Sequence, residues 1–205
     1  MSTIKKFSDI PQFTRSGSWQ CDFDIDGLKR FIEDEIENDG LQLNPPFQRG
    51  HVWTEEQQIA FLEYFFKGGK SGTIIYFNKP DWNISVPEGA YNDFVCVDGL
   101  QRITAILRFV NNEIRIFGNF YKEFEDKPRM RHTIKININD LQTEQEVLQW
   151  YIDMNAGGTP HTSEEINKVK KMIEQLKIYK ALLEPVKSVY EEEQQNDIKK
   201  KSRKK

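Results

Sequence analysis

The chain has 205 residues, of which 38% are hydrophobic and 12% aromatic, and its formal net charge is −3. This length corresponds to one folded domain, and 14 Phe, 7 Tyr and 4 Trp exclude a chain that is disordered throughout. No uncharged apolar run approaches the roughly 20 residues that cross a bilayer, and the N-terminus lacks the apolar stretch of a secretory signal. We therefore expect a cytoplasmic protein without a membrane span.

Hydrophobic periodicity predicts strands interspersed with helices. Apolar side chains three and four positions apart mark the helices, and β-branched or alternating runs mark the strands. In chain order these are helix 25–37, helix 55–67, strand 73–77, strand 94–97, a helix that carries Ile103, Ile106, Leu107 and Val110, strands 113–117 and 133–138, helix 144–154, and a last helix that starts near Ser163 and falters before Pro185. This order predicts one compact α+β domain with a mixed sheet, flanking helices and a C-terminal helix.

Local signals predict where several of these helices begin and end. Asp24 or Asp26 can cap the first helix, and Gly40 follows its last residues. Thr54 opens a capping box, in which a hydroxyl and a side-chain amide satisfy the free N–H groups of the first turn. Thr143 opens a second pattern of this kind.

Composition divides the chain into a flexible arm over residues 1–17, a folded domain over 18–186 and a charged, disordered tail over 187–205. Six of the last seven residues are basic. Without residues 191–205 the chain carries 23 basic and 28 acidic side chains, which is not typical of a duplex-DNA-binding surface. The basic tail could contact nucleic acid or another polyanion, or it could be a solvated terminus.

The most informative segment is the junction between strand 94–97 and the helix that follows it. Gly99 lets an anion approach the backbone where the N–H groups and the positive dipole end of a helix point. Arg102 adds a permanently charged, forked donor that suits phosphate oxygens. Asp98 could hold a magnesium ion or accept from a ribose hydroxyl. In the alternative interpretation Asp98 caps the helix, and Arg102 pairs with it or with a surface carboxylate.

A second segment places Gln48 and Arg49 between a diproline and Trp53. A stiff loop of this kind can hold an arginine at a fixed angle. The alternative is a loop in which Phe47 and Trp53 anchor the packing while Arg49 is solvated.

A third segment, over residues 155–160, pairs two glycines between two helices. It leaves backbone amides and a hydroxyl open to a ligand, although such a Gly-Gly turn is more often a plain helix C-cap. The residues concerned are Asn155, Gly157, Gly158 and Thr159.

Together the segments FQRGHVW, VDGLQRITAI and YIDMNAGGTP resemble, in this order, three motifs of the N-terminal domain of GmrSD-type, modification-dependent restriction systems. That domain is similar to the ParB/sulfiredoxin fold. The resemblance spans about residues 40–167. Gly99, Arg102 and Ala105 also fit the Gly-x-x-Arg-x-x-Ala pattern of ParB-type nucleotide sites.

The resemblance implies that residues 18–186 form a ParB/sulfiredoxin-like domain that binds a nucleoside triphosphate with Mg²⁺. Whether the domain also hydrolyses it, as a Mg²⁺-dependent triphosphatase, stays open. The implied catalytic residues are Asp98, which would also be the metal ligand, Gln101 and Arg102. The implied nucleotide-binding residues are Gln48, Arg49, Gly99, Arg102, Thr104, Asn155, Gly157, Gly158 and Thr159.

One position departs from the family pattern, which usually has Asp-Gly-Gln-Gln-Arg at the junction. This chain has Leu100 where the first Gln would stand. If that Gln positions the attacking water, the protein could bind nucleotide without hydrolysing it. Leu100 could equally occupy an outward-facing position of no consequence.

Restriction proteins of this kind carry a further nuclease region, often with a His-Asn-His site. The histidines of this chain, His51, His132 and His161, lack ligand spacing, so we expect no self-sufficient nuclease of that type. The leading hypothesis is a nucleotide-binding regulatory module that works with a separate nuclease subunit. The alternatives are a DNA-binding or protein-interaction module without catalysis (an orphan subunit or a decoy), and a nuclease built on the ParB-like fold itself.

Overall fold

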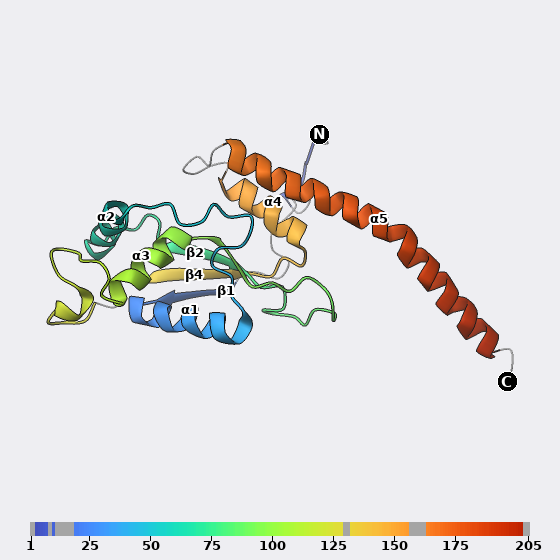
Figure 1. Ribbon diagram of the computed structural model, residues 1–205, viewed down its shortest axis with the longest axis horizontal. Helices are drawn as coiled ribbons and strands as arrows, with labels where there is room; N and C mark the ends of the chain where they lie inside the picture. The colour runs from blue at the N-terminus through green and yellow to red at the C-terminus, as the bar shows by residue number, and fades with distance from the viewer. Residues whose placement is uncertain (1–2, 8–9, 11–18, 129–131, 156–162, 203–205) are drawn as a thin grey trace. The chain divides into compact units, whose positions relative to one another are not determined.

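The computed structural model describes residues 3–7, 10, 19–128, 132–155 and 163–202. The contacts group the chain into two units, Met1–Tyr151 and Ile152–Lys205, and helix α4 crosses the boundary between them. The elements in chain order are β1 (Trp19–Phe23), α1 (Ile25–Asp39), α2 (Glu55–Phe66), β2 (Ile74–Asn78), β3 (Val95–Asp98), α3 (Leu100–Val110), the 3₁₀-helix η2 (Tyr121–Glu123), β4 (Ile134–Asn139), α4 (Glu144–Asn155) and α5 (Ser163–Ser202), as Figure 1 shows. Helices and strands are interspersed, which confirms the predicted α+β class.

Within the described residues, the strands β1 to β4 form a mixed sheet in the order β1-β4-β2-β3. β4 pairs antiparallel with β1 and parallel with β2, and β2 pairs antiparallel with β3. A register shift between Tyr76 and Phe77 interrupts the β2–β3 ladder, so that Tyr76 lies opposite Asp98. The edge strand β3 ends at Asp98, and Gly99 alone separates it from α3.

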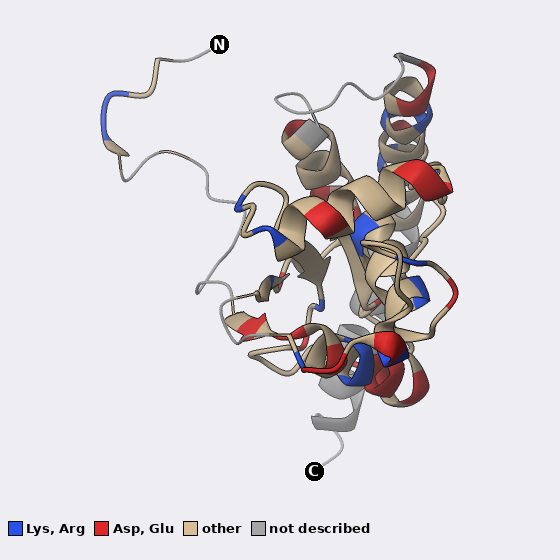
Figure 2. Ribbon diagram, turned by 90° about the vertical axis from the view of Figure 1, so that its left-hand side faces the viewer, with Lys and Arg blue, Asp and Glu red and all other residues tan. Residues whose placement is uncertain are grey.

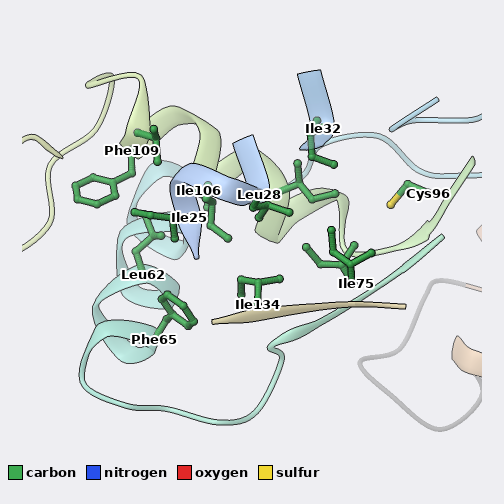
Figure 3. Close-up of a cluster of buried hydrophobic side chains, with 14 of the residues drawn as sticks. Ile25, Leu28, Ile32, Leu62, Phe65, Ile75, Cys96, Ile106, Phe109 and Ile134 are labelled. Atoms are coloured by element: carbon green, nitrogen blue, oxygen red, sulfur yellow. The ribbon is translucent and has the colours of Figure 1, made fainter. Parts of the chain in front are cut away.

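One face of the sheet packs against α1, α2 and α3, and Figure 3 shows part of the resulting core. Side chains alternate between the faces of a strand, and the apolar side chains of the two central strands on this face are fully buried. They are Ile75 and Phe77 of β2 and Ile134, Ile136 and Ile138 of β4, which pack with Leu28 and Ile32 of α1, Leu62 and Phe65 of α2, and Ile103 and Ile106 of α3. Burying each such side chain contributes about 1.5–3 kcal/mol, so this cluster is the main source of stability in the first unit.

Tyr76 lies between two core residues of β2 and therefore points to the opposite face of the sheet. Its ring meets Trp150 of α4 edge-on, with 6.0 Å between the ring centroids. Trp150 and Tyr151 are both buried. The first part of α4 thus lies against this second face, next to β2.

The predicted helix ends are confirmed by hydrogen bonds. Asp24 Oδ1 accepts from the Gly27 N–H at 2.6 Å, and Gly40 ends α1 in the left-handed conformation with φ 66°. Thr54 and Gln57 form the predicted capping box of α2. Thr143 Oγ1 accepts from the Glu146 N–H at 3.2 Å at the start of α4.

The prediction of a strand over 113–117 is wrong. Asn112 and Phe117 have positive φ values of 61° and 49°, which break an extended backbone on both sides, and a single bridge joins Ile116 to Asn119. Ile114 and Ile116 are nevertheless buried. Their alternation with charged residues therefore reflects two side chains that anchor a loop to the core.

The sequence prediction missed β1. This strand pairs antiparallel with β4 over Trp19–Phe23, at the other edge of the sheet. Trp19, Cys21 and Phe23 alternate with Gln20 and Asp22 and are only partly buried, so the alternation typical of a half-buried strand is present in the sequence although the prediction did not use it.

The predicted end of the last helix is also wrong, because α5 continues through Pro185 to Ser202. Proline opposes a helix at one position, whereas residues with high helix propensity such as Ala, Leu, Glu and Lys favour it on both sides. Among the described residues, no helix has the length and apolar character needed to cross a bilayer. The domain boundaries after residues 17 and 186 and the disorder of the tail stay predictions.

Acidic side chains crowd the C-terminal end of α1, which has no basic residue in its last turn. Burial, and then the neighbouring Asp39, raise the pKa of Glu35 above its ordinary value of 4.5. A carboxyl whose pKa is raised by folding stabilises the protein below its unfolded pKa, and this contribution is lost as the pH rises through the folded pKa.

We therefore expect Glu35→Gln to increase the free energy of unfolding at neutral pH by about 0.5 kcal/mol, because it removes a charge that opposes both Asp39 and the helix dipole. The gain should vanish well below pH 4.5, where Glu35 is protonated. Urea denaturation at both pH values measures this, and an equal gain at both would contradict the electrostatic explanation.

Candidate functional site

The turn from β3 into α3 consists of Gly99 alone. Gly99 is the N-cap residue of α3, with φ 126° and ψ 0°, and no side chain caps the first turn of this helix. A Cβ atom at Gly99 would lie 2.9 Å from two carbon atoms of Ile75, closer than carbon atoms normally approach. Backbone conformation and packing therefore both require glycine here, and Gly99 itself supplies no side chain to cap the first helical turn.

Asp98 and Arg102 form an ion pair across this turn, between Asp98 Oδ2 and Arg102 Nη2. Arg102 Nη1 also donates to the Gly72 carbonyl at 3.4 Å. The Arg102 side chain is 15% exposed, whereas that of Asp98 is 44% exposed. The pairing of Arg102 with Asp98, which the alternative interpretation of the sequence expected, is therefore observed. The helix cap that the same interpretation expected from Asp98 is not observed. Its carboxylate compensates the unfavourable position of Arg102 at the positive end of α3.

Gln101 connects this turn to the loop of the first motif. Its Oε1 accepts from the backbone N–H groups of Val52 and Trp53 at 2.9 and 3.0 Å, and lies 3.0 Å from His51 Nδ1. Its Nε2 donates to the Gly50 carbonyl at 2.8 Å. The side-chain amide is therefore engaged at both ends in holding the loop. The catalytic role of Gln101 stays a prediction.

Gln48 anchors the other end of the same loop. Its Nε2 donates to the Cys96 carbonyl of β3 at 2.6 Å. Arg49 is partly buried and lies between Gln48 and Gly50, so its backbone is held on both sides by side-chain hydrogen bonds to β3 and α3. The structure therefore brings the first and second motifs into direct contact, as a site shared between them requires.

Two further residues of α3, Thr104 and Leu100, lie close to the predicted site in the sequence. Thr104 Oγ1 donates to the Leu100 carbonyl at 2.9 Å, so this hydroxyl proton is used within the helix, and nucleotide binding by Thr104 stays a prediction. Leu100 is 7% exposed. The idea of an outward-facing Leu100 is therefore wrong, and the site lacks a polar side chain at this buried position.

The third motif is placed only in part. Tyr151 of α4 meets Phe47 of the first motif edge-on, with 5.2 Å between the ring centroids. Asn155 is the last residue of α4. Gly157, Gly158 and Thr159 lie outside the described residues, and their predicted contribution to the site stays a prediction.

Two features of this site were not predicted from the sequence. Tyr76 lies opposite Asp98 in the β2–β3 ladder, and directly opposite residues of an antiparallel pair share one face of the sheet. The turn that precedes β2 contributes the Gly72 carbonyl to Arg102. The glycine-rich composition of residues 68–72 indicated a turn, but no local signal indicates which side chain that turn meets.

The turn offers one protein ligand to a magnesium ion, the carboxylate of Asp98. Among the described residues there is no group of three or more His, Cys, Asp or Glu side chains placed to hold a metal ion. Mg²⁺ is commonly bound by one or two carboxylates together with waters and phosphate oxygens, so the exposed carboxylate of Asp98 fits a metal that arrives with a nucleotide. The neighbouring Cys96 is unsuitable, because burial, and then the charge of Asp98, raise the pKa of its thiol to about 12.

The chain matches a known family model. The family model described as GmrSD restriction endonuclease, N-terminal domain, matches residues 28–203. No curated protein and no solved structure matches the chain. The family match covers most of the 205 residues and includes all three motifs, which confirms the resemblance found in the sequence. The chain therefore belongs to the family of GmrSD restriction endonuclease N-terminal domains, a family of restriction-system modules.

Proposed function

We propose that this domain binds a nucleoside triphosphate together with Mg²⁺ at the start of α3, and that binding regulates a restriction system. The observation that carries the proposal is the uncapped N-terminus of α3 beside Arg102, whose partner is the half-exposed carboxylate of Asp98. A helix N-terminus favours anions, and a guanidinium there requires a negative partner. A phosphate group satisfies both requirements.

Each residue of the turn has a separate task in this proposal. Arg102 supplies a forked, permanently charged donor to phosphate oxygens, and the N–H groups that follow Gly99 supply neutral donors. Gly99 permits close approach because it has no side chain. Asp98, once Arg102 has a phosphate partner, holds Mg²⁺ or orients a water molecule.

The loop of the first motif completes the proposed site. Arg49 supplies a second positive charge from a backbone that Gln48 and Gly50 anchor to β3 and α3. A charged donor on an anchored loop loses little conformational freedom on binding. We propose that Asn155, Gly157, Gly158 and Thr159 line the remaining side.

We propose that any hydrolysis of the bound triphosphate is slow. Gln101 uses its amide to hold the loop, and Leu100 brings no polar group to the turn. Asp98 is therefore the residue proposed to orient an attacking water.

The test is calorimetric titration of the protein with each of the four ribonucleoside triphosphates and Mg²⁺, followed by measurement of phosphate release. Saturable binding of at least one triphosphate is expected. Binding with release would assign a triphosphatase, and binding without release would assign a nucleotide sensor. Absence of binding to all four would contradict the proposal.

A second candidate function is DNA binding, which the six basic side chains at the C-terminus favour. The remainder of the chain does not share this charge, and Figure 2 shows acidic and basic residues interspersed along the described helices and loops. Deleting residues 199–205 separates the two candidates. The nucleotide hypothesis expects unchanged nucleotide affinity, whereas the DNA hypothesis expects lost DNA retention in a gel-shift assay.

A further inference from the structure

His51 lies between two side-chain amides that come from different helices. Its Nδ1 is 3.0 Å from Gln101 Oε1 of α3, and its Nε2 is 3.1 Å from Gln58 Nε2 of α2. Gln58 is 3% exposed, so this contact joins the loop to the protein interior. The imidazole thus bridges the loop of the first motif to two helices at once.

The orientation of both amides is determined by their other partners. Gln101 Oε1 accepts from the N–H groups of Val52 and Trp53, which can only donate. Gln58 Oε1 accepts from Arg108 Nη1 at 2.8 Å, and Arg108 can only donate, while Gln58 Nε2 donates to the Trp53 carbonyl at 3.2 Å. Neither amide can therefore be turned round without losing these bonds.

These orientations assign the proton of the imidazole. Because Gln101 presents an oxygen, Nδ1 of His51 must carry a proton and donate it. Because Gln58 presents an N–H group, Nε2 of His51 must be unprotonated and accept. His51 is therefore the neutral Nδ1–H tautomer, and either the other tautomer or a charged imidazolium would place two donors against each other.

Arg108 secures the far end of this arrangement. Besides Gln58, it contacts Glu55 at the start of α2 through Nη2 at 2.9 Å and Glu113 after α3 through Nε at 3.2 Å. The contacts run from Gln101, the second residue of α3, through His51 to Gln58 of α2. From Gln58 they return to α3 at Arg108, two turns after Gln101. They fix the loop relative to the helix whose N-terminus forms the proposed phosphate site.

We infer that His51, in its neutral Nδ1–H form, is a positioning residue that holds the Gln48–Arg49 loop against the N-terminus of α3 and so increases nucleotide affinity. This inference rests on the proposed function. His51 acts through Gln101 and Gln58, and it has no contact with the proposed ligand in this role. Since it contributes two hydrogen bonds to the loop, its loss should weaken nucleotide binding by about tenfold.

The experiment combines two measurements without nucleotide and one with it. The ¹⁵N chemical shifts of the His51 ring at neutral pH identify the tautomer, and amide hydrogen exchange at Val52 and Trp53 reports how firmly the loop is held. Calorimetric titration with a triphosphate and Mg²⁺ then gives the affinity. The variants are His51→Leu, which removes both bonds, His51→Asn, whose amide N–H replaces the donor at Nδ1, and Glu56→Gln, a control at an exposed position in the first turn of α2.

We expect a proton on Nδ1 of His51. Amide exchange at Val52 and Trp53 should be about tenfold faster in His51→Leu than in the wild type, and His51→Asn should largely restore the wild-type exchange rate. The nucleotide affinities of the variants should follow the same order. Glu56→Gln should match the wild type throughout. A proton on Nε2, or wild-type affinity in His51→Leu, would overturn the inference. If the wild-type protein binds no triphosphate, the proposed function and the role of His51 in affinity both fail, while the tautomer and exchange results still decide whether His51 holds the loop.

Discussion

Gly99→Ala is expected to decrease the free energy of unfolding by about 2–5 kcal/mol. Two costs combine at this position. The φ value of 126° is unfavourable for any residue with a Cβ atom, and that atom would lie 2.9 Å from Cγ1 and Cγ2 of Ile75. Ile75 is fully buried on the central part of the sheet and cannot move away without disturbing the core.

Gly40→Ala provides the matched control, because Gly40 also has a positive φ, of 66°, but nothing lies within 4 Å of its added Cβ. It should cost only about 1 kcal/mol, which is the backbone term alone. The double variant Gly99→Ala with Ile75→Ala should be less destabilised than the sum of the two single variants, because the two 2.9 Å contacts disappear and only the 3.2 Å contact with Cβ of residue 75 remains. Urea denaturation of the four variants and the wild type measures these differences. A cost at Gly99 no greater than that at Gly40 would contradict the packing argument.

Arg102→Ala is expected to weaken nucleotide binding at least 100-fold, about 3 kcal/mol, while leaving the fold intact. Arg102 is proposed to be the charged partner of the phosphate groups, and no other described side chain donates to the Asp98 carboxylate at this turn. The fold should tolerate the change, since Asp98 is half-exposed and can be solvated when its partner is lost. Arg102→Lys should retain part of the affinity, because it keeps the charge but loses the forked geometry.

Arg115→Ala is the control for this experiment. Arg115 lies over the Phe120 ring at 4.2 Å in the loop after α3, and it is exposed. Its replacement should leave the dissociation constant unchanged. Calorimetric titration gives the constants, and circular dichroism verifies the fold. An unchanged dissociation constant in Arg102→Ala would refute the assignment of the phosphate site.

Prediction from the sequence succeeded where the determining contacts are local. Asp24 caps α1 through an N–H group three residues away, and Thr54 and Gln57 satisfy each other across the first turn of α2. Such bonds form within one turn of chain, so a short pattern contains all the partners. The apolar spacing along α1, α2 and α3 likewise predicted helices, because the period of the helix itself sets which residues face the core.

Prediction failed where the same pattern has two structural explanations. Ile114 and Ile116 alternate with charged residues as in a strand, yet they anchor a loop whose neighbours Asn112 and Phe117 have positive φ. Periodicity reports burial of alternate side chains, and it does not report whether a partner strand is present to accept the backbone hydrogen bonds.

For the candidate site, the sequence by itself determined the turn: Gly99 between a buried strand and a helix, with Asp98 and Arg102 four residues apart, close enough to pair. Only the tertiary structure decided what surrounds that turn. The partners of Gln101 lie about 50 positions away in the sequence, and Tyr76 reaches the Asp98 side of the sheet through the register of β2 and β3. Register and loop path depend on the packing of α1, α2 and α3 against the whole sheet, so no segment of the sequence contains them.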